Sequence, residues 1–368
     1  MRTGIITYHN AINYGAVLQA YALQQVLLGM GVQCDIIDYS CPAVDKQYRR
    51  KKISDRAYWK EYVLDFLSAH RLDSKKEAFQ KFRAEHLCLS EKIDNASCEN
   101  FDIYDALIVG SDQVFNPKNT EGDSFYLLDF QCNSKKIAYA ASIGNNKFLK
   151  LWKEKYNVDY VSLLKQFDSI SFREEAASVF VSDLMNNSYE TTLDPVILAG
   201  TDVWQEFQGD ESEDYIFVYN LGNIPLLVES VKNIQKETGL KVRVVNKDVK
   251  GDFLLRDFDN VSSISPIEFL RMLSGAKYVI TDSFHGTAFS VLYHKNFISV
   301  VNPHKVNTNS RIVDLLKKLN LQERIVTEAD GFRYDSITTY AEVDEKIREM
   351  QKHSIEWLRK ALEIKESR

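Results

Sequence analysis

Hydrophobic and polar positions follow two recurring patterns along this chain. Short apolar runs such as 106–109 and 278–281 are typical of buried strands, whereas 16–28 carries apolar residues at the i, i+3, i+4 spacing of a helix. The two patterns alternate almost throughout, which predicts a mostly parallel sheet covered by helices on both faces. Further strands are predicted at 3–8, 32–38, 136–141, 168–172, 215–220, 241–245 and 297–301, and further helices at 174–184, 225–238, 266–274 and 286–294.

The order of these elements predicts two domains. The first series closes near Asp194-Pro195, and a second series starts at Tyr215. A chain of 368 residues is long enough for two domains of ordinary size. We therefore expect an α/β fold with two Rossmann-like doubly wound domains facing a cleft, at 1–198 and 199–335. The remaining segment, 336–368, has the pattern of an amphipathic helix that packs back on the body.

Composition narrows the class of protein. Hydrophobic residues make up 45% and charged residues 27%, as in soluble globular proteins, and the net charge of −6 argues against nucleic acid as a partner. The basic cluster 46–56 is interpreted as a solvated loop, with contact to the anionic inner face of a membrane as the alternative.

The five cysteines form no C-x-x-C pair, so no metal site or disulfide framework is expected. No signal-peptide or membrane-spanning pattern is found, so we expect a cytoplasmic protein.

The most informative stretch is the polar turn that follows the predicted strand 278–281. It contains Asp282, Ser283 and His285, and Gly286 begins a helix-like pattern. In open α/β sheets ligands bind at the carboxyl ends of the strands, and a helix N-terminus there favours an anion. Histidine is the side chain best suited to transfer a proton near neutral pH. A lone histidine at such a position is more often a capping or packing residue, so the rest of the chain has to decide between the two interpretations.

The first loop of the chain also lies at the end of a predicted strand. Asn13, Tyr14 and Gln19 could hydrogen-bond the hydroxyls of a sugar, and Gly15 would allow a close backbone approach. The alternative is that Asn13 and Gly15 are ordinary turn and helix-start residues. The loop lacks a G-x-G-x-x-G pattern, so a dinucleotide-phosphate turn is not supported.

Two later junctions offer charged groups. Ser111 and Asp112 follow the strand 106–109, and Asp112 could accept a proton from an attacking hydroxyl or simply cap the next turn. Arg173 follows the strand 168–172, where a guanidinium suits a planar carboxylate or phosphate. An ion pair with a nearby acidic residue is the alternative for Arg173.

A second arginine stands at the start of a helix. Ser310 is a good N-cap, so Arg311 falls in the first helical turn, where the helix dipole disfavours a cation and favours an anionic partner for it. No Ser-His-Asp order, H-E-x-x-H or P-loop pattern is present. One histidine, two arginines and several hydroxyl or amide groups at strand–helix junctions suit a small anionic donor and a polyhydroxylated acceptor.

Together these segments resemble the polysaccharide pyruvyl transferase family. The motifs that carry the resemblance occur in the expected order at 13–24, 104–116, 169–174, 193–195, 280–288 and 309–311. The resemblance implies a glycosyltransferase-B-like fold with the acceptor side in 1–198 and the donor side in 199–335. It also implies transfer of a pyruvyl group from phosphoenolpyruvate to two hydroxyls of a sugar in a cell-surface polysaccharide or its precursor, forming a cyclic ketal. Phosphoenolpyruvate is then a co-substrate, no cofactor is expected, and the acceptor is carried on a lipid or a nucleotide.

The resemblance also suggests roles for the site residues. The expected set comprises His285 and Asp112 as catalytic residues, Arg311, Arg173, Ser283 and Gly286 as donor-binding residues, and Asn13, Tyr14, Gln19, Ser111 and Asn116 as acceptor-binding residues. Many similar members carry a Ser-Arg-Leu-His run, and Ser283 stands here in place of that arginine, so Arg311, Lys295 or Lys305 has to replace its charge. The alternatives are a nucleotide-sugar-dependent glycosyltransferase and a non-catalytic glycan-binding protein of the same fold.

Overall fold

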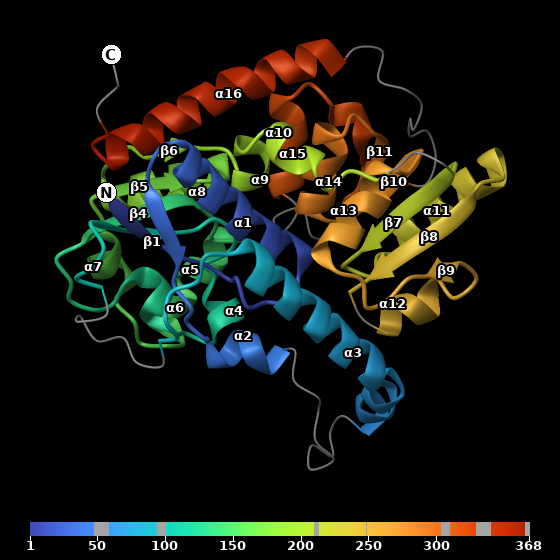
Figure 1. The fold of residues 1–368 in the computed structure, drawn as a ribbon, viewed down its shortest axis with the longest axis horizontal. Helices are drawn as coiled ribbons and strands as arrows, with labels where there is room; N and C mark the ends of the chain where they lie inside the picture. The colour runs from blue at the N-terminus through green and yellow to red at the C-terminus, as the bar shows by residue number, and fades with distance from the viewer. Residues whose placement is uncertain are drawn as a thin grey trace. The chain divides into compact units, whose positions relative to one another are not determined.

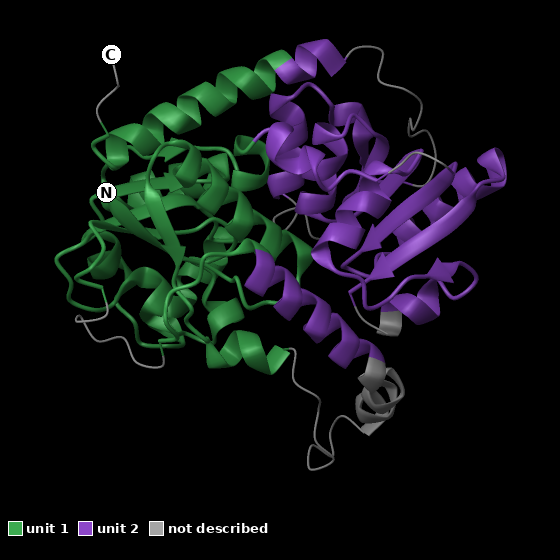
Figure 2. Cartoon of the chain, viewed as in Figure 1, with its two compact units in different colours: residues 1–48, 86–199, 345–368 green, residues 49–85, 200–344 purple. Residues whose placement is uncertain are grey.

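The apolar, β-branched runs of the sequence form two six-stranded parallel sheets in the computed structural model (Figure 1). The structure describes residues 1–47, 59–93, 101–209, 213–247, 249–302, 310–328 and 340–364. Each sheet belongs to one of two units that are assembled from separate stretches of chain (Figure 2). Unit 1 comprises 1–48, 86–199 and 345–368, and unit 2 comprises 49–85 and 200–344. In this division, residues 59–85 group with the second half of the chain.

The sheet of unit 1 has the strand order β2-β1-β3-β4-β5-β6. Its strands are β1 (Arg2–Ile6), β2 (Gln33–Ile36), β3 (Ala106–Val109), β4 (Lys135–Ala141), β5 (Ser169–Phe172) and β6 (Glu190–Thr191). Its helices are α1 (Tyr14–Gly29), α2 (Pro42–Gln47), α4 (Pro117–Thr120), α5 (Asn146–Leu149), α6 (Leu151–Glu154), α7 (Tyr160–Leu164), α8 (Glu175–Met185) and α9 (Pro195–Leu198). Helix α1 packs on β2 and α9 and is buried on nearly all sides, as its nearly continuous apolar sequence requires.

The sheet of unit 2 has the order β12-β11-β10-β7-β8-β9, which is the strand order of a Rossmann fold. Its strands are β7 (Tyr215–Asn220), β8 (Lys241–Asn246), β9 (Asp259–Asn260), β10 (Tyr278–Thr281), β11 (Asn296–Val300) and β12 (Ile325–Val326). Its helices are α3 (Trp59–His86), α10 (Asp202–Gln205), α11 (Pro225–Thr238), α12 (Val249–Leu254), α13 (Pro266–Ser274), α14 (Phe284–Leu292) and α15 (Ser310–Lys318). Helix α11 packs on β7 and β10, and α14 packs on β10 and β11.

The prediction of two doubly wound α/β domains is confirmed, and each sheet has a point where its strand order reverses. In unit 1 this point lies between β1 and β3, and in unit 2 between β7 and β10. Ligands of such folds bind outside the carboxyl ends of the strands at this switch point. The expected cleft between the domains stays a prediction.

The C-terminal helix α16 (Tyr340–Ala361) begins in unit 2 and ends in unit 1. In unit 1, the Ser354 hydroxyl accepts a hydrogen bond from the Leu193 amide at 3.0 Å, and the Gln351 amide donates to the Ile197 carbonyl at 2.8 Å. Leu358 and Leu362 are fully buried. The end of this helix is therefore part of the core of unit 1.

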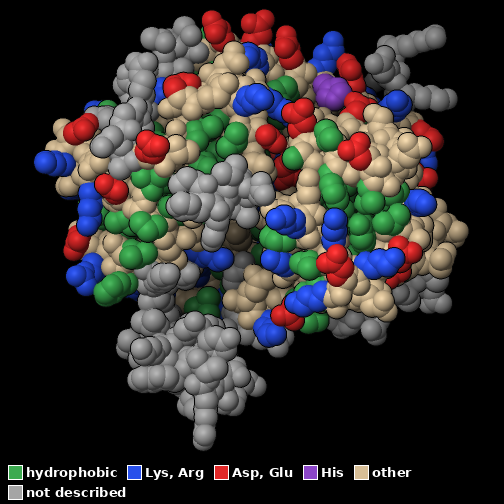
Figure 3. Space-filling model, turned by 180° about the vertical axis from the view of Figure 1, so that it is seen from behind, with side chains coloured by type: hydrophobic (Ala, Val, Ile, Leu, Met, Phe, Trp, Pro, Cys, Tyr) green, Lys and Arg blue, Asp and Glu red, His purple; other side chains and the backbone are tan. Residues whose placement is uncertain are grey.

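Acidic and basic side chains are interleaved over the face shown in Figure 3. Of the basic cluster predicted as a loop or membrane contact, 48–56 lies outside the described residues, and Lys46 forms an exposed ion pair with Glu121 at 3.2 Å. Among the helices that the structure describes, none combines the length and the apolar character of a membrane span.

Candidate active site

The switch point of unit 2 is held together by Asp282, the first residue after β10. Its carboxylate accepts hydrogen bonds from the backbone amides of Leu221, at 2.7 Å, and Gly222, which both follow β7. Burial raises the pKa of Asp282 to about 6, although the two backbone donors act in the opposite direction. A carboxyl group with this pKa can exchange a proton near neutral pH. No role was predicted for Asp282 from the sequence, although the residue lies in the same turn as His285.

The turn between β10 and α14 is built around Ser283. The Ser283 hydroxyl accepts a hydrogen bond from the Gly286 amide at 3.3 Å and so caps the helix, while the Ser283 amide donates to the Thr281 hydroxyl at 3.0 Å. His285 is the second residue of the helix and is only 7% exposed. Its ring lies edge-on to that of Phe284, with a centroid distance of 5.2 Å. The Ser283 side chain is buried and serves as the helix cap, and its contact with the donor stays a prediction.

Gly286 lets the first turn of α14 approach the end of β10. A Cβ atom on Gly286 would lie 2.5 Å from the Thr281 hydroxyl oxygen and 3.1 Å from the Thr281 Cβ. Thr281 is held in place because its hydroxyl donates to the Tyr219 carbonyl at 2.9 Å. The close contact with Thr281 is therefore sufficient to explain a glycine at position 286, which was predicted to bind the donor.

The predicted replacements for the family arginine differ in their placement. Arg311 lies in the first turn of α15 and is half-buried. Lys295 is buried, and its ammonium group donates to the Ser274 carbonyl at 2.5 Å inside the fold, so its role as a donor contact stays a prediction. Lys305 lies outside the described residues, as does Asn309.

The switch point of unit 1 is tied together by Gln19. Its side-chain amide donates to the Thr7 hydroxyl at 2.7 Å, after β1, and its carbonyl oxygen accepts from the Ser111 amide at 3.0 Å, after β3. The Ser111 hydroxyl donates to the Ala140 carbonyl at 2.8 Å. Gln19 and Ser111 are both fully buried and position the two loops, and their contact with a sugar stays a prediction.

Three further predicted acceptor residues also serve the fold. Asn13 is half-buried and caps α1 by accepting from the Ala16 amide at 3.3 Å, and Tyr14 is 2% exposed. Asn116 is 3% exposed and caps α4 by accepting from the Lys118 amide at 3.1 Å. The cap of that turn is therefore Asn116 and not Asp112. For Asn13 the structure favours the interpretation as a helix-start residue, whereas the acceptor contacts of Tyr14 and Asn116 stay predictions.

Arg173 lies among three carboxylates at the carboxyl ends of β3 and β5. Its guanidinium is 2.6 Å from Asp194, 3.6 Å from Asp112 and 3.8 Å from Glu174, and its side chain is 3% exposed. Burial lowers the pKa of Arg173, but the three carboxylates outweigh this effect and raise it above its ordinary value. The structure favours the ion-pair interpretation of Arg173, and its role in donor binding stays a prediction.

Asp112 is the most exposed member of this cluster. Its side chain is 16% exposed, against 5% for Glu174 and 1% for Asp194. Asp194 also caps α9 by accepting from the Val196 amide at 3.0 Å, a role that the Asp-Pro sequence indicates. In the part of the chain that the structure describes, no group of three or more potential metal ligands is found.

Comparisons with known proteins agree with the motifs of the sequence. A sequence profile described as polysaccharide pyruvyl transferase matches residues 13–304. No curated protein matches the chain.

Solved structures share the chain's architecture only distantly. The UDP-GlcNAc 2-epimerase from Methanocaldococcus jannaschii is 11% identical, with 95% of this chain and 93% of that chain covered and a TM-score of 0.46. The UDP-N-acetylglucosamine 2-epimerase from Rickettsia bellii is 11% identical, with 99% of each chain covered and a TM-score of 0.46. The E. coli heptosyltransferase WaaC with ADP is 14% identical, with 95% of this chain and 100% of that chain covered and a TM-score of 0.41. Likenesses at this level assign neither a ligand nor a reaction.

Proposed function

Because the chain belongs to the polysaccharide pyruvyl transferase family, we propose that it transfers the pyruvyl group of phosphoenolpyruvate to two hydroxyls of one sugar, forming a cyclic ketal. The family match over 13–304 is the observation that carries this proposal. The acceptor is a cell-surface polysaccharide or its lipid- or nucleotide-linked precursor, and the reaction takes place in the cytoplasm.

The reaction requires two proton transfers. Two acceptor oxygens bond to C2 of phosphoenolpyruvate, and the bond from C2 to the phosphate oxygen breaks. One hydroxyl proton ends on the methylene carbon, which becomes a methyl group, and the other leaves with hydrogen phosphate. The protein must therefore supply an acid for the carbon, a base for a hydroxyl and cations for the anionic donor.

We assign these tasks to three of the predicted residues. His285, which belongs to unit 2, is the proton-transferring residue. Its position in the first turn of α14, after β10, supports this role. Arg311 contacts the donor anion, and Asp112 in unit 1 takes a hydroxyl proton. Asp282 holds the turn before His285 against the loop after β7 and is a positioning residue.

The test replaces His285 by alanine and measures phosphate release from phosphoenolpyruvate in the presence of a glycan acceptor. Loss of a proton-transferring group predicts a decrease of at least about a hundredfold in turnover. His294→Ala is the matched control, because His294 follows the same helix but pairs with Asp344 at 2.8 Å on the surface. Near wild-type turnover of a folded His285→Ala protein would refute the assignment.

A ligand comparison separates this function from the nucleotide-sugar alternative. We expect phosphoenolpyruvate to raise the thermal unfolding midpoint, since a ligand that binds only the folded state stabilises it. Nucleotide diphosphate sugars serve as the comparison ligands. Stabilisation by these and not by phosphoenolpyruvate would indicate a glycosyltransferase.

A further inference from the structure

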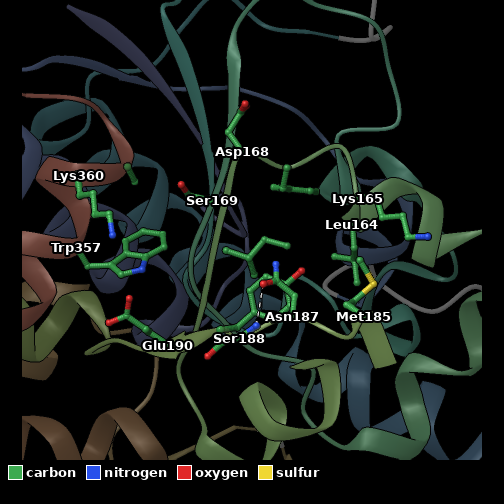
Figure 4. Close-up of a pocket in the computed structure, with 14 residues that line it drawn as sticks. Leu164, Lys165, Asp168, Ser169, Met185, Asn187, Ser188, Glu190, Trp357 and Lys360 are labelled. Atoms are coloured by element: carbon green, nitrogen blue, oxygen red, sulfur yellow. Dashed lines mark hydrogen bonds between the residues drawn. The ribbon is translucent and has the colours of Figure 1, made fainter. Parts of the chain in front are cut away.

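Unit 1 contains a pocket of about 360 Å³ at the end of its sheet opposite the Arg173 cluster (Figure 4). Ser169, the first residue of β5, lines it, whereas Arg173 follows the last residue of the same strand. The other walls come from the end of α7, the connection between α8 and β6, and the last turns of α16. The pocket is therefore separate from the candidate active site, and its size is in the range of small-molecule sites.

One wall of the pocket is the indole ring of Trp357 on α16. This side chain is half-buried, and its ring lies 5.9 Å from that of Tyr139, which is fully buried. Tyr139 is fixed in turn, because its hydroxyl donates to the Leu193 carbonyl at 2.9 Å. The indole is thus supported by a fixed ring and also faces the pocket (Figure 4). A rigid aromatic surface with a polar edge suits a ligand that has both apolar and polar faces.

Polar groups of several kinds surround this ring. Asn187 and Ser188 come from the connection between α8 and β6, and Glu190 is the first residue of β6 (Figure 4). Lys360 lies one helical turn after Trp357. Glu190 carries a half-exposed ion pair with His353 at 3.3 Å. The lining therefore offers acceptors, donors and both signs of charge around one aromatic surface.

This combination selects among classes of ligand. The carboxylates of Asp168 and Glu190 offset the charges of Lys165 and Lys360, so the lining offers a multiply charged anion no net positive charge. A purely apolar ligand would bury polar groups without partners. A sugar ring has C–H faces that pack on an indole and hydroxyls that both donate and accept. We propose that this pocket binds one saccharide unit of a glycan, stacked on Trp357 and hydrogen-bonded by Glu190 and Asn187. This inference rests on the proposed function only for the origin of the saccharide, which is the glycan acceptor. Binding of the saccharide in this pocket does not require pyruvyl transfer.

The test follows the Trp357 resonance in the fluorine spectrum of the full chain labelled with 5-fluorotryptophan, assigned with Trp357→Phe. The probes are the methyl glycosides of glucose, galactose, rhamnose and N-acetylglucosamine. We expect at least one to shift the resonance saturably and Glu190→Gln or Asn187→Ala to weaken its binding about tenfold, as for a lost hydrogen bond. Glu175→Gln, at an exposed carboxylate in the first turn of α8, should leave the affinity unchanged.

Two controls keep the outcome decisive. Cyclohexanol has the size of a sugar ring without its hydroxyl pattern, so equal binding of cyclohexanol, or no shift with any of the four glycosides, would overturn the proposal. The His285→Ala protein should bind the glycoside as the wild type does. Loss of pyruvyl transfer and loss of glycoside binding in this pocket are therefore measured separately.

Discussion

At the scale of single residues, Asp282 and Arg173 show how similar junctions acquire different chemistry. Each directly follows a strand, but Asp282 meets backbone amides, whereas Arg173 meets three carboxylates. The amides do not offset the burial of Asp282, so its pKa rises to about 6. The carboxylates hold Arg173 charged inside the fold. Asp282 is thus the residue of this pair that can titrate near neutral pH.

Replacement of Asp282 by asparagine tests this titration. The unfolded carboxyl group has a pKa near 3.8 and the folded one about 6, so the folded protein binds the proton more tightly. The stability that this proton contributes is fully present below the unfolded pKa and is lost as the pH rises through the folded pKa. The free energy of unfolding changes by at most about 3 kcal/mol over this range. We measure the difference between the thermal unfolding midpoints of the wild type and of Asp282→Asn. We expect the wild type to lose stability relative to the variant as the pH is raised from about 4 to about 6.5. A pH-independent difference would contradict the raised pKa.

Sequence reasoning could place polar residues at the junctions but could not tell whether their side chains were free to meet a ligand. Gln19 and Ser111 were predicted to contact a sugar, yet both are fully buried and bridge two loops. A hydrogen-bonding group that could hold a hydroxyl is equally able to satisfy backbone groups where a sheet reverses its order. Only the three-dimensional neighbours of Gln19 and Ser111 distinguish the two uses.

At the scale of elements, the start of α14 joins a helix cap to the candidate catalytic residue. Ser283 caps the helix two residues before His285, so replacement of Ser283 by alanine should cost about 1 kcal/mol and release the first turn. We expect a lower thermal midpoint together with slower phosphate release, and Ser283→Thr should restore both. Ser265→Ala is the control, since Ser265 caps α13 in the same unit, and it should lower the midpoint alone. Equal effects of both caps on phosphate release would argue against a special role of this turn.

The contact of α14 with β10 predicts the effect of a side chain at Gly286. Alanine is normally favoured over glycine inside a helix by about 1 kcal/mol, but overpacking costs about 1–3 kcal/mol. Because the new Cβ would lie 2.5 Å from the Thr281 hydroxyl oxygen, we expect Gly286→Ala to destabilise the protein in urea unfolding. Thr281→Ala should reduce that cost in the double variant. Gly29→Ala, where nothing lies within 4 Å, should be neutral or stabilising, and an identical loss at Gly29 would contradict the packing argument.

The elements that the sequence predicted best are those with a long pattern. The strands 215–220 and 278–281 and the helices 225–238 and 266–274 have the predicted bounds. The edge strands β6, β9 and β12 were missed, because each is two residues long and too short for any periodicity. Their pairing depends on a neighbouring strand that only the folded sheet provides.

At the scale of the whole molecule, segments that are far apart in the sequence belong to the same unit. Residues 345–368 complete unit 1, although unit 2 separates them from the rest of it. The sequence indicated an amphipathic helix here but not its partner, because an apolar stripe does not specify the surface that covers it. In the structure that surface includes Leu193 and Ile197, whose backbone groups bond to α16.

A chain that ends at residue 344, the last residue of unit 2, should therefore lose stability in unit 1 and not in unit 2. Removal of the rest of α16 uncovers core that Leu358 and Leu362 bury, and large core losses cost several kcal/mol. Hydrogen exchange followed by mass spectrometry should show faster exchange in β4 and β5 and unchanged protection in β7 and β8. Leu358→Asp should reproduce this pattern in the full-length chain, whereas Glu356→Ala, at an exposed position of the same helix, should not. Equal loss of protection in both units would mean that α16 stabilises the molecule in some way other than by completing the core of unit 1.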